Sequence, residues 1–276
     1  MTRHIYRCPL RWSDQDAQGH INNVVVVDYL QEARVDFLLS SPLADMLTAG
    51  VLVVSHQVEY LRPIEFSTEP IRVELWADSV GAARFAISYE LFAGAAPENP
   101  VARARTVITP FDLTANTIRR LTVDERALLA DAAEPAIELR PLARIELPAN
   151  AFVWPCRVRW SDLDAYGHVN NVKFFEFLQE SRIATIAPAW QPDQTWLLVR
   201  QDLEYRTPLD FSRTPYPVHV AVAALGTSSM TLATEIRDPA GTVYATARTV
   251  IVLADLNLAP IPLTDALRTQ VAGYAV

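Results

Sequence analysis

The feature that most constrains this chain is an internal repeat. When the sequence is shifted by 148 residues, 11–34 falls on 159–182, and 15 of the 24 paired positions are identical. Average composition predicts roughly one or two identities by chance. Further along, Glu59-Tyr60 pairs with Glu204-Tyr205 at a shift of 145, and the shift falls to 143 near the end of the chain. A drifting shift indicates two copies of one fold whose loops differ in length.

Two copies are too few for a solenoid, whose repeats stack in series. A length of 276 residues fits two domains. We therefore expect two homologous domains in tandem, packed about a pseudo-twofold axis as in a homodimer. The predicted domains are 1–111 and 151–276, the second ending in a C-terminal helix. The segment between them, 112–150, contains three prolines and is predicted to be a linker with a helical stretch near Val123–Ala133.

Each copy predicts one long helix among strands. The expected strands of the first copy are His4–Trp12, Val51–Leu61, Ile71–Val80, Arg84–Phe92 and Val101–Phe111, and its helix is Val24–Leu39. The second copy offers Phe152–Trp160, Trp196–Arg206, Pro217–Ala224, Ser229–Arg237 and Thr242–Leu253, with a helix over Val172–Ala187. Both helices are apolar around most of their circumference, which is typical of buried helices. The fold class is therefore α+β: in each half, a long buried helix wrapped by an antiparallel sheet of about five strands.

Charge and composition exclude several classes of protein. There are 24 basic and 32 acidic residues, a net charge of -8, whereas general nucleic-acid or membrane-surface binders present a basic face. No apolar run approaches the roughly 18 residues of a membrane span, and residues 1–12 lack the apolar stretch of a signal peptide. We expect a soluble, cytoplasmic protein that binds neither nucleic acid nor membrane.

The motifs of several cofactor and hydrolase classes are missing from the sequence. It contains no GxGxxG, GxSxG, P-loop or HExxH pattern. The two cysteines, Cys8 and Cys156, are too few for a disulfide scaffold and too far apart for a zinc site. They alternate with apolar residues, which favours buried packing over nucleophilic catalysis. We expect no metal and no cofactor.

The repeated block places two carboxylates in a loop before each helix. They are Asp14 and Asp16 in the first copy, and Asp162 and Asp164 in the second. A carboxylate beside a helix N-terminus can act as base or nucleophile, while free N–H groups there polarise a carbonyl. Alternatively, an Asp can tie down its own loop through Asx-type hydrogen bonds. With two carboxylates in each loop, one can be structural and the other chemical.

Glycine, histidine and asparagine complete the block. Gly19 and Gly167 precede His20 and His168, and the pairs Asn22-Asn23 and Asn170-Asn171 follow. We expect each His to support the loop by hydrogen bonding, because one His per copy without a partner at ligand spacing does not make a metal site. The Asn pairs predict helix caps, a position at which backbone N–H groups converge.

Charged pairs elsewhere have structural interpretations. Glu32 with Arg34, and Glu180 with Arg182, are predicted to form ion pairs beside the buried helices. Glu59-Tyr60 and its repeat could line a pocket, but ordinary sheet packing is the stronger interpretation.

The block R-W-S-D-x-D-x-x-G-H-[IV]-N-N-V, followed by a helix containing L-Q-E-x-R, resembles the hotdog-fold thioesterases. It is most similar to the 4-hydroxybenzoyl-CoA thioesterase-like acyl-CoA thioesterases, and also to acyl-ACP thioesterases with a related D-x-N-x-H-V-N-N block. The resemblance covers both halves, about 110 residues each, and implies a tandem double hotdog. It implies hydrolysis of acyl-CoA to free acid and CoA, in fatty acid metabolism.

The resemblance also implies roles for the repeated residues. The catalytic carboxylate falls on Asp16 and Asp164, and the N–H groups that bind the oxyanion fall at Asn23 and Asn171. His20, His168, Asn22, Asn170, Gly19 and Gly167 then support the site. Family active sites form at the dimer interface, so each pocket is expected to draw on both halves. Candidates to bind CoA phosphates are Arg62, Arg84 and Arg206, with none preferred.

The two pockets are not expected to be equivalent. The family pattern places an aromatic residue shortly after the Asn pair. Phe174-Phe175 satisfies this pattern, whereas the first copy has Val26-Val27. Likewise Gln18 corresponds to Tyr166 in the second copy.

Three alternatives remain open. Acyl carrier protein could replace CoA, although acyl-ACP relatives carry Asn where this chain has Asp, and its acidic charge disfavours an acidic carrier. A non-catalytic acyl-CoA-binding hotdog protein would not need the two loop carboxylates. A hotdog hydratase or dehydratase resembles a different block, with Asp and His five residues apart, whereas Asp16 and His20 are four apart. Association into larger homo-oligomers is also expected.

Overall fold

The computed structural model describes residues 3–94 and 98–276, which form two compact units. Unit 1 is Met1–Arg140 and unit 2 is Pro141–Val276. Outside the described residues lie positions 1, 2 and 95–97 of the first predicted domain. The segment 1–12, in which we expect no signal peptide, is therefore described only in part.

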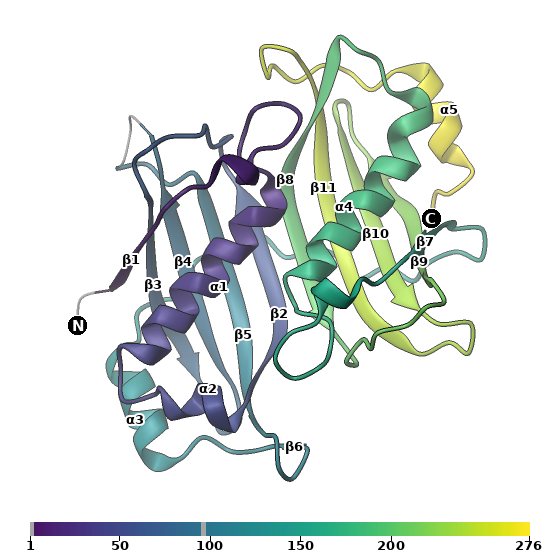
Figure 1. The fold of residues 1–276 in the computed structure, drawn as a ribbon. Coiled ribbons are helices and arrows are strands. Elements are labelled where there is room, and N and C mark those ends of the chain that lie inside the picture. The colour runs from purple at the N-terminus through teal and green to yellow at the C-terminus, as the bar shows by residue number, and fades with distance from the viewer. Residues whose placement is uncertain (1–2, 95–97) are drawn as a thin grey trace. The chain divides into compact units, whose positions relative to one another are not determined.

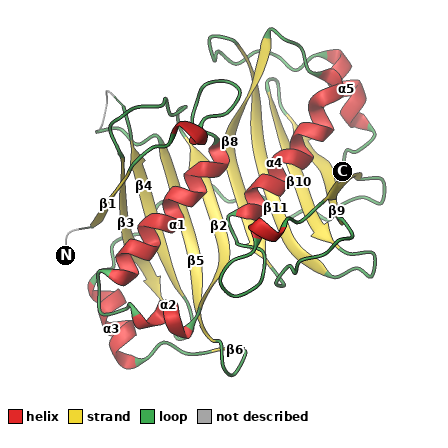
Figure 2. Ribbon diagram, in the orientation of Figure 1, coloured by secondary structure: helices red, strands yellow, loops and turns green. Residues whose placement is uncertain are grey.

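Unit 1 is one antiparallel sheet with a long helix, α1, across one face (Figures 1 and 2). Its strand order is β1-β3-β4-β5-β2. The elements are β1 (His4–Cys8), a 3-10 turn (Trp12–Asp14), α1 (Asn23–Leu39), α2 (Asp45–Ala49), β2 (Val51–Tyr60), β3 (Ile71–Val80), β4 (Phe85–Phe92), β5 (Ala102–Asp112), β6 (Thr117–Ile118) and α3 (Val123–Asp131).

Unit 2 repeats this arrangement, with strand order β7-β9-β10-β11-β8 and α4 across one face of the sheet. The elements are β7 (Phe152–Cys156), a 3-10 turn (Trp160–Asp162), α4 (Lys173–Ile186), a 3-10 turn (Ala187–Ala189), β8 (Gln194–Tyr205), β9 (Tyr216–Leu225), β10 (Ser229–Arg237), β11 (Val243–Asp255) and α5 (Asp265–Ala272). The predicted α+β class, with one buried helix and five antiparallel strands in each half, is confirmed.

Helix α1 forms despite a run of four valines that favours strand. The side-chain oxygen of Asn22 accepts a hydrogen bond from the N–H of Val24 at 3.0 Å, which caps the first turn. Three aliphatic side chains of the helix, those of Val26, Val27 and Leu30, are at most 1% exposed. Burial of three large aliphatic side chains stabilises the helix by several kcal/mol, more than the tenths of a kcal/mol that separate valine from good helix formers.

The opening strands are shorter than predicted. β1 and β7 end at Cys8 and Cys156, and Trp12 and Trp160 begin 3-10 turns instead. The reason is a side chain: the carboxylate of Asp14 accepts from the backbone N–H of Arg11 at 2.7 Å, which turns the chain. The short helix α2 was also not predicted.

The segment predicted as a linker contributes to both units. Its helical stretch is α3, within unit 1, and the division between the units follows Arg140. After α3, Glu134 donates its N–H to the carbonyl of Ala77 on β3. In unit 2, Arg248 on β11 donates to the carbonyls of Ala143 and Ile145 at 3.0 and 2.7 Å. Extended backbone on either side of the division therefore lies along each unit's own sheet.

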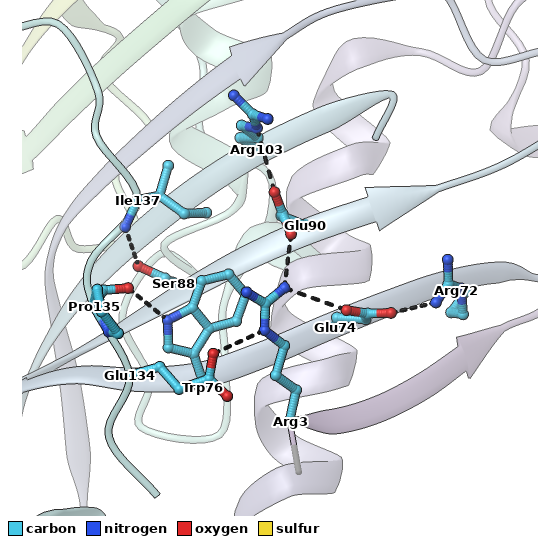
Figure 3. A network of polar contacts seen from close by, with 10 residues as sticks. All are labelled: Arg3, Arg72, Glu74, Trp76, Ser88, Glu90, Arg103, Glu134, Pro135 and Ile137. Carbon is cyan, nitrogen blue, oxygen red and sulfur yellow. Dashed lines mark hydrogen bonds and ion pairs between the residues drawn. The ribbon is translucent and has the colours of Figure 1, made fainter. Parts of the chain in front are cut away.

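A charged cluster holds the segment after α3 to the sheet face opposite α1 (Figure 3). The guanidinium of Arg3 contacts Glu90, Glu134 and Glu74 at 2.7, 3.1 and 3.3 Å. It also lies 3.7 Å from the ring centroid of Trp76, whose indole N–H donates to the carbonyl of Pro135 at 3.0 Å. One cation thus joins β3, β4 and the segment after α3.

We predict that Arg3→Ala lowers the free energy of unfolding by about 1–3 kcal/mol, because Glu134 then loses the Arg3 cation while Glu74 and Glu90 keep only Arg72 and Arg103. Urea denaturation measures this change. The matched control is Arg126→Ala, which removes an exposed arginine of α3. Equal midpoints for the two variants would contradict the prediction.

Candidate functional site

In unit 1, Asp14 is the structural carboxylate of the repeated loop. It is 8% exposed, and its Oδ2 accepts from the N–H of Arg11 and the hydroxyl of Tyr29, each at 2.7 Å. Its carbonyl accepts from the N–H of Asn22 at 2.8 Å. Burial, followed by the adjacent carboxylate, raises the pKa of Tyr29, so this hydroxyl stays protonated and donates. Asp14 therefore joins the start of the loop, at Arg11, to its end at Asn22 and to Tyr29 on α1.

Asp16 is held at one oxygen only. Its Oδ1 accepts from the backbone N–H groups of Gln18 and His20 at 2.8 and 3.2 Å. The backbone N–H of Asp16 donates to the carbonyl of His20 at 2.7 Å. Among the described residues no group donates to Oδ2, and the side chain is half-buried. This carboxylate is positioned by its own loop yet keeps one oxygen available for chemistry.

A glycine makes this loop possible. Gly19 has a φ of +80° and Gly167 a φ of +82°, a backbone region that is strained for residues with a Cβ. Each glycine donates its N–H to the carbonyl of the aspartate three residues earlier, at 3.1 Å. The glycine of the motif is therefore required by the turn that places Asp16 and Asp164.

The loop of unit 2 has the same division of roles. Asp162 is 4% exposed, its carboxylate accepts from the N–H of Arg159 at 2.7 Å, and its carbonyl accepts from the N–H of Asn170 at 2.8 Å. Asp164 accepts at Oδ1 from the N–H of Tyr166 at 2.8 Å. One difference stands out: Phe177 occupies the position of Tyr29, so Asp162 lacks the hydroxyl donor.

In unit 1, α1 begins directly after the loop, and its first residue carries a backbone N–H that can bind a ligand. Asn22 caps the N–H of Val24, and its carbonyl accepts from Val25. The N–H of Asn23, the first helical residue, donates to no acceptor among the described residues. Such N–H groups, together with the helix dipole, favour negative charge. They are suited to binding a developing oxyanion.

The corresponding helix start in unit 2 lies two residues later, because α4 begins at Lys173. Asn170 accepts at its side chain from Val172 at 3.3 Å, and Asn171 donates its side-chain amide to Asn170 at 3.2 Å. The two helix starts are therefore built from the same residues but not in the same way.

The tyrosine of each repeated Glu-Tyr pair contacts a helix start. The hydroxyl of Tyr60 donates to the carbonyl of Asn23 at 3.0 Å, and that of Tyr205 donates to the carbonyl of Asn171 at 2.7 Å. Sequence reasoning favoured plain sheet packing for these tyrosines and missed this role. The signal was present, since the Glu-Tyr pair occurs in both copies, at a shift of 145.

The histidines position the loop through their backbone. The N–H and carbonyl of His20 both bond Asp16, while its imidazole makes no hydrogen bond among the described residues. In unit 2 the carbonyl of His168 accepts from Asp164 at 2.8 Å, and its Nε2 lies 3.7 Å from Asp210. No cluster of His, Cys, Asp and Glu suited to a metal ion occurs within 3–94 and 98–276.

The predicted ion pair of Glu32 with Arg34 does not form as expected. Within the part of the chain that the structure describes, no ion pair joins these two residues, and Nη1 of Arg34 is buried without a hydrogen-bond partner. Residues two apart on a helix point in nearly opposite directions, so they do not meet. Arg34 is instead 5% exposed within unit 1.

A family model described as the thioesterase-like superfamily matches residues 10–141 and 158–271. The chain belongs to this superfamily. Its two matched segments contain both loops and both long helices, as the internal repeat requires.

Three solved structures share the fold over nearly the whole chain. A protein proposed to be an oleoyl thioesterase from Lactobacillus plantarum has a TM-score of 0.74 at 15% identity, covering 95% of this chain and 97% of that one. A 12:0-ACP thioesterase from Umbellularia californica has a TM-score of 0.74 at 16% identity, covering 90% and 93%. An acyl-ACP thioesterase from Bacteroides thetaiotaomicron has a TM-score of 0.68 at 13% identity, covering 90% and 96%.

These likenesses establish the double-hotdog fold. Comparison with curated protein sequences found no match. None of the helices within the described ranges is long and apolar enough to cross a membrane.

We predict that Tyr29→Phe lowers the free energy of unfolding by about 1–2 kcal/mol, because buried Asp14 loses a donor. The matched variant is Phe177→Tyr, which offers unit 2 the missing donor and is expected to raise stability by up to about 1 kcal/mol. Chemical denaturation of both variants measures the pair. An unchanged midpoint for Tyr29→Phe would contradict the role given to Asp14.

We predict that neither cysteine of the folded protein is readily alkylated at pH 8. Burial, and then nearby carboxylates, raises the pKa of Cys8 to about 11 and that of Cys156 to about 12. The thiolate fraction at pH 8 is then on the order of 10⁻³ or less, and it rises only as the pH approaches these values. Iodoacetamide labelling with and without urea tests this. Equal rates in both conditions would contradict the prediction.

Proposed function

We propose that this protein hydrolyses acyl thioesters, with Asp16 and Asp164 as the catalytic carboxylates. The observation that carries the proposal is the loop of unit 1. There Oδ1 of Asp16 accepts from two backbone N–H groups, while among the described residues Oδ2 has no donor and the N–H of Asn23, at the start of the helix that follows the loop, has no acceptor. A base and an oxyanion donor on one rigid loop-helix unit are the two requirements of acyl transfer. Membership of the superfamily supports the same reaction.

In a general-base route, Asp16 activates a water molecule. Oδ2 of Asp16 removes a proton from water, and the water oxygen bonds to the thioester carbon. The charge that forms on the carbonyl oxygen is stabilised by the helix N-terminal N–H groups, a contribution of about 3 kcal/mol for one donor in other acyl-transfer enzymes. The C–S bond then breaks, and the thiolate takes the proton from Asp16.

A nucleophilic route uses the same atoms. Oδ2 attacks the carbonyl carbon, the C–S bond breaks and the thiolate leaves, which gives a mixed anhydride of Asp16 and the acyl group. Water then hydrolyses the anhydride to the free acid and the Asp16 carboxylate, and the proton released from water goes to the thiolate. Both routes require an ionised Asp16 carboxylate whose Oδ2 is accessible to water or to the thioester carbon. The roles of His20, Gly19 and Asn22 are then to hold this loop in place.

The carrier of the acyl group is CoA or acyl carrier protein. Two of the similar solved structures are acyl-ACP thioesterases, which favours the carrier protein. The retained Asp in both loops favours CoA, as the sequence resemblance implies. Comparing kcat/KM for one acyl group on the two carriers, with dodecanoyl and oleoyl among the acyl groups tested, distinguishes them.

We predict that the double variant Asp16→Asn/Asp164→Asn loses at least about 10²-fold in kcat, the usual range for a general base. The reason is that an amide cannot accept the proton of water. Release of free thiol from acyl-CoA and acyl-ACP measures the rate, and the single variants report how the two loops share it.

The control for this experiment is Asp193→Asn, an exposed carboxylate outside the loops. Undiminished turnover in the double variant would overturn the assignment of the catalytic carboxylates. A wild-type protein that binds acyl-CoA but releases no thiol would favour the non-catalytic acyl-binding alternative.

A further inference from the structure

Each repeated loop carries a tryptophan that is largely exposed to solvent. Trp12 and Trp160 are 76% and 74% exposed. Each meets a phenylalanine edge-on: Trp12 and Phe66 have ring centroids 5.4 Å apart at 79°, and Trp160 and Phe211 have centroids 5.5 Å apart at 78°. Both units thus build the same aromatic pair on their surface.

Packing does not account for these tryptophans. A tryptophan contributes to stability chiefly by burying its large apolar surface, and these two leave about three-quarters of theirs in water. The tryptophan belongs to the repeated block, and both copies build the pair with the same geometry. Exposed tryptophans in a defined arrangement are typical of binding sites.

An exposed arginine precedes the tryptophan of each pair. Arg11 and Arg159 immediately precede the tryptophans and are exposed. Neither guanidinium makes a hydrogen bond or an ion pair among the described residues. By contrast, two of the arginines that the sequence offers as candidates to bind CoA phosphates already have partners. Arg62 donates to the carbonyl of Asn99, and Arg206 forms an ion pair with Glu204. The arginines of the loops are therefore available to an anion.

The tryptophans belong to the same loops as the proposed catalytic carboxylates. The carbonyl of Trp12 accepts from the side-chain amide of Gln15 at 3.3 Å, within the loop that holds Asp16. Four residues separate Trp12 from Asp16, so their Cα atoms are at most about 14 Å apart. A ligand bound at the rings is therefore within reach of the proposed catalytic carboxylate through a flexible arm.

We propose that each set of Arg, Trp and Phe, here called the ring platform, binds the adenosine 3′,5′-bisphosphate end of coenzyme A. The ring platforms are Arg11, Trp12 and Phe66 in unit 1, and Arg159, Trp160 and Phe211 in unit 2. The adenine stacks on the exposed indole, and the guanidinium binds a phosphate group. The pantetheine arm then carries the thioester to the loop. This last step rests on the proposed hydrolysis, whereas nucleotide binding can be measured without it.

Size and charge favour a nucleotide over a carrier protein as the occupant. One exposed ring, its partner and an arginine match a single base and phosphate, whereas a stable protein interface covers about 800 Å² on each partner. The net charge of -8 also opposes association with an acidic carrier protein.

The ring platform of unit 2 is expected to bind more tightly. Arg213 follows Phe211 by two residues and makes no ion pair among the described residues, whereas Thr68 takes its place in unit 1. The neighbouring carboxylate Asp210 lies 3.7 Å from His168. A second cation adds a second phosphate contact.

The first test compares acyl-CoA with the same acyl group on pantetheine, which lacks the nucleotide. In Trp12→Ala/Trp160→Ala, we expect the ratio of kcat/KM for acyl-CoA to that for acyl-pantetheine to fall roughly 5- to 150-fold. Trp160→Ala alone should lower it more than Trp12→Ala. The matched control is Trp190→Ala. Trp190 is another exposed tryptophan, at 54%, and it lies after the C-terminal end of α4.

A ratio that stays constant while both rates fall would overturn the proposal, since the tryptophans would then serve the loop and not the nucleotide. A ratio unchanged with both rates intact would overturn it as well.

The second test keeps the proposal separate from hydrolysis. Titration of the wild-type protein with adenosine 3′,5′-bisphosphate by calorimetry is expected to show binding that weakens with salt and in Arg159→Gln. Binding in a protein that cleaves no thioester would support the ring platform while rejecting the proposed function. No binding, together with acyl-ACP turnover that falls in the tryptophan variants, would assign this surface to a carrier protein and overturn the proposal.

Discussion

The candidate site depends on one backbone hydrogen bond, repeated in each unit. In unit 1 the carbonyl of Asp14 accepts from the N–H of Asn22 at 2.8 Å, and in unit 2 Asp162 accepts from Asn170 at the same distance. This bond closes the loop onto the residue that precedes the long helix. Without it, the carboxylate in the loop and the N–H groups of the helix would move independently, and the chemistry of acyl transfer requires both at fixed positions.

The two carboxylates of each loop illustrate how burial separates roles. Asp14 and Asp162 are almost fully buried, and Oδ2 of each accepts from a backbone N–H group of its own turn. Asp16 and Asp164 are half-buried and bonded at Oδ1. A buried, hydrogen-bonded carboxylate stabilises a turn, while a partly exposed one with an unengaged oxygen can exchange protons with a substrate or water.

The copies have diverged where their loops and helices meet. Tyr29 donates to Asp14, whereas Phe177 leaves Asp162 without that donor. α1 begins at Asn23, the residue with the free N–H, while α4 begins two residues after the equivalent position. Val26 and Val27 are replaced by Phe174 and Phe175, all of them buried. The two candidate sites therefore share the residues of the repeated loop but differ in the helix start and in the side chains packed beside it.

The sequence by itself determined the repeat, the fold class, the buried helices and the loop residues. These follow from period, apolar content and capping residues, which act over a few positions of the chain. Only the tertiary structure showed which aspartate of each pair is buried and bonded to its own turn, because that depends on backbone groups, and in unit 1 also on Tyr29, that folding brings together. The tyrosines that hold the helix starts and the cluster around Arg3 are likewise contacts between distant segments. Their energies depend on burial and geometry, which no local pattern of residues records.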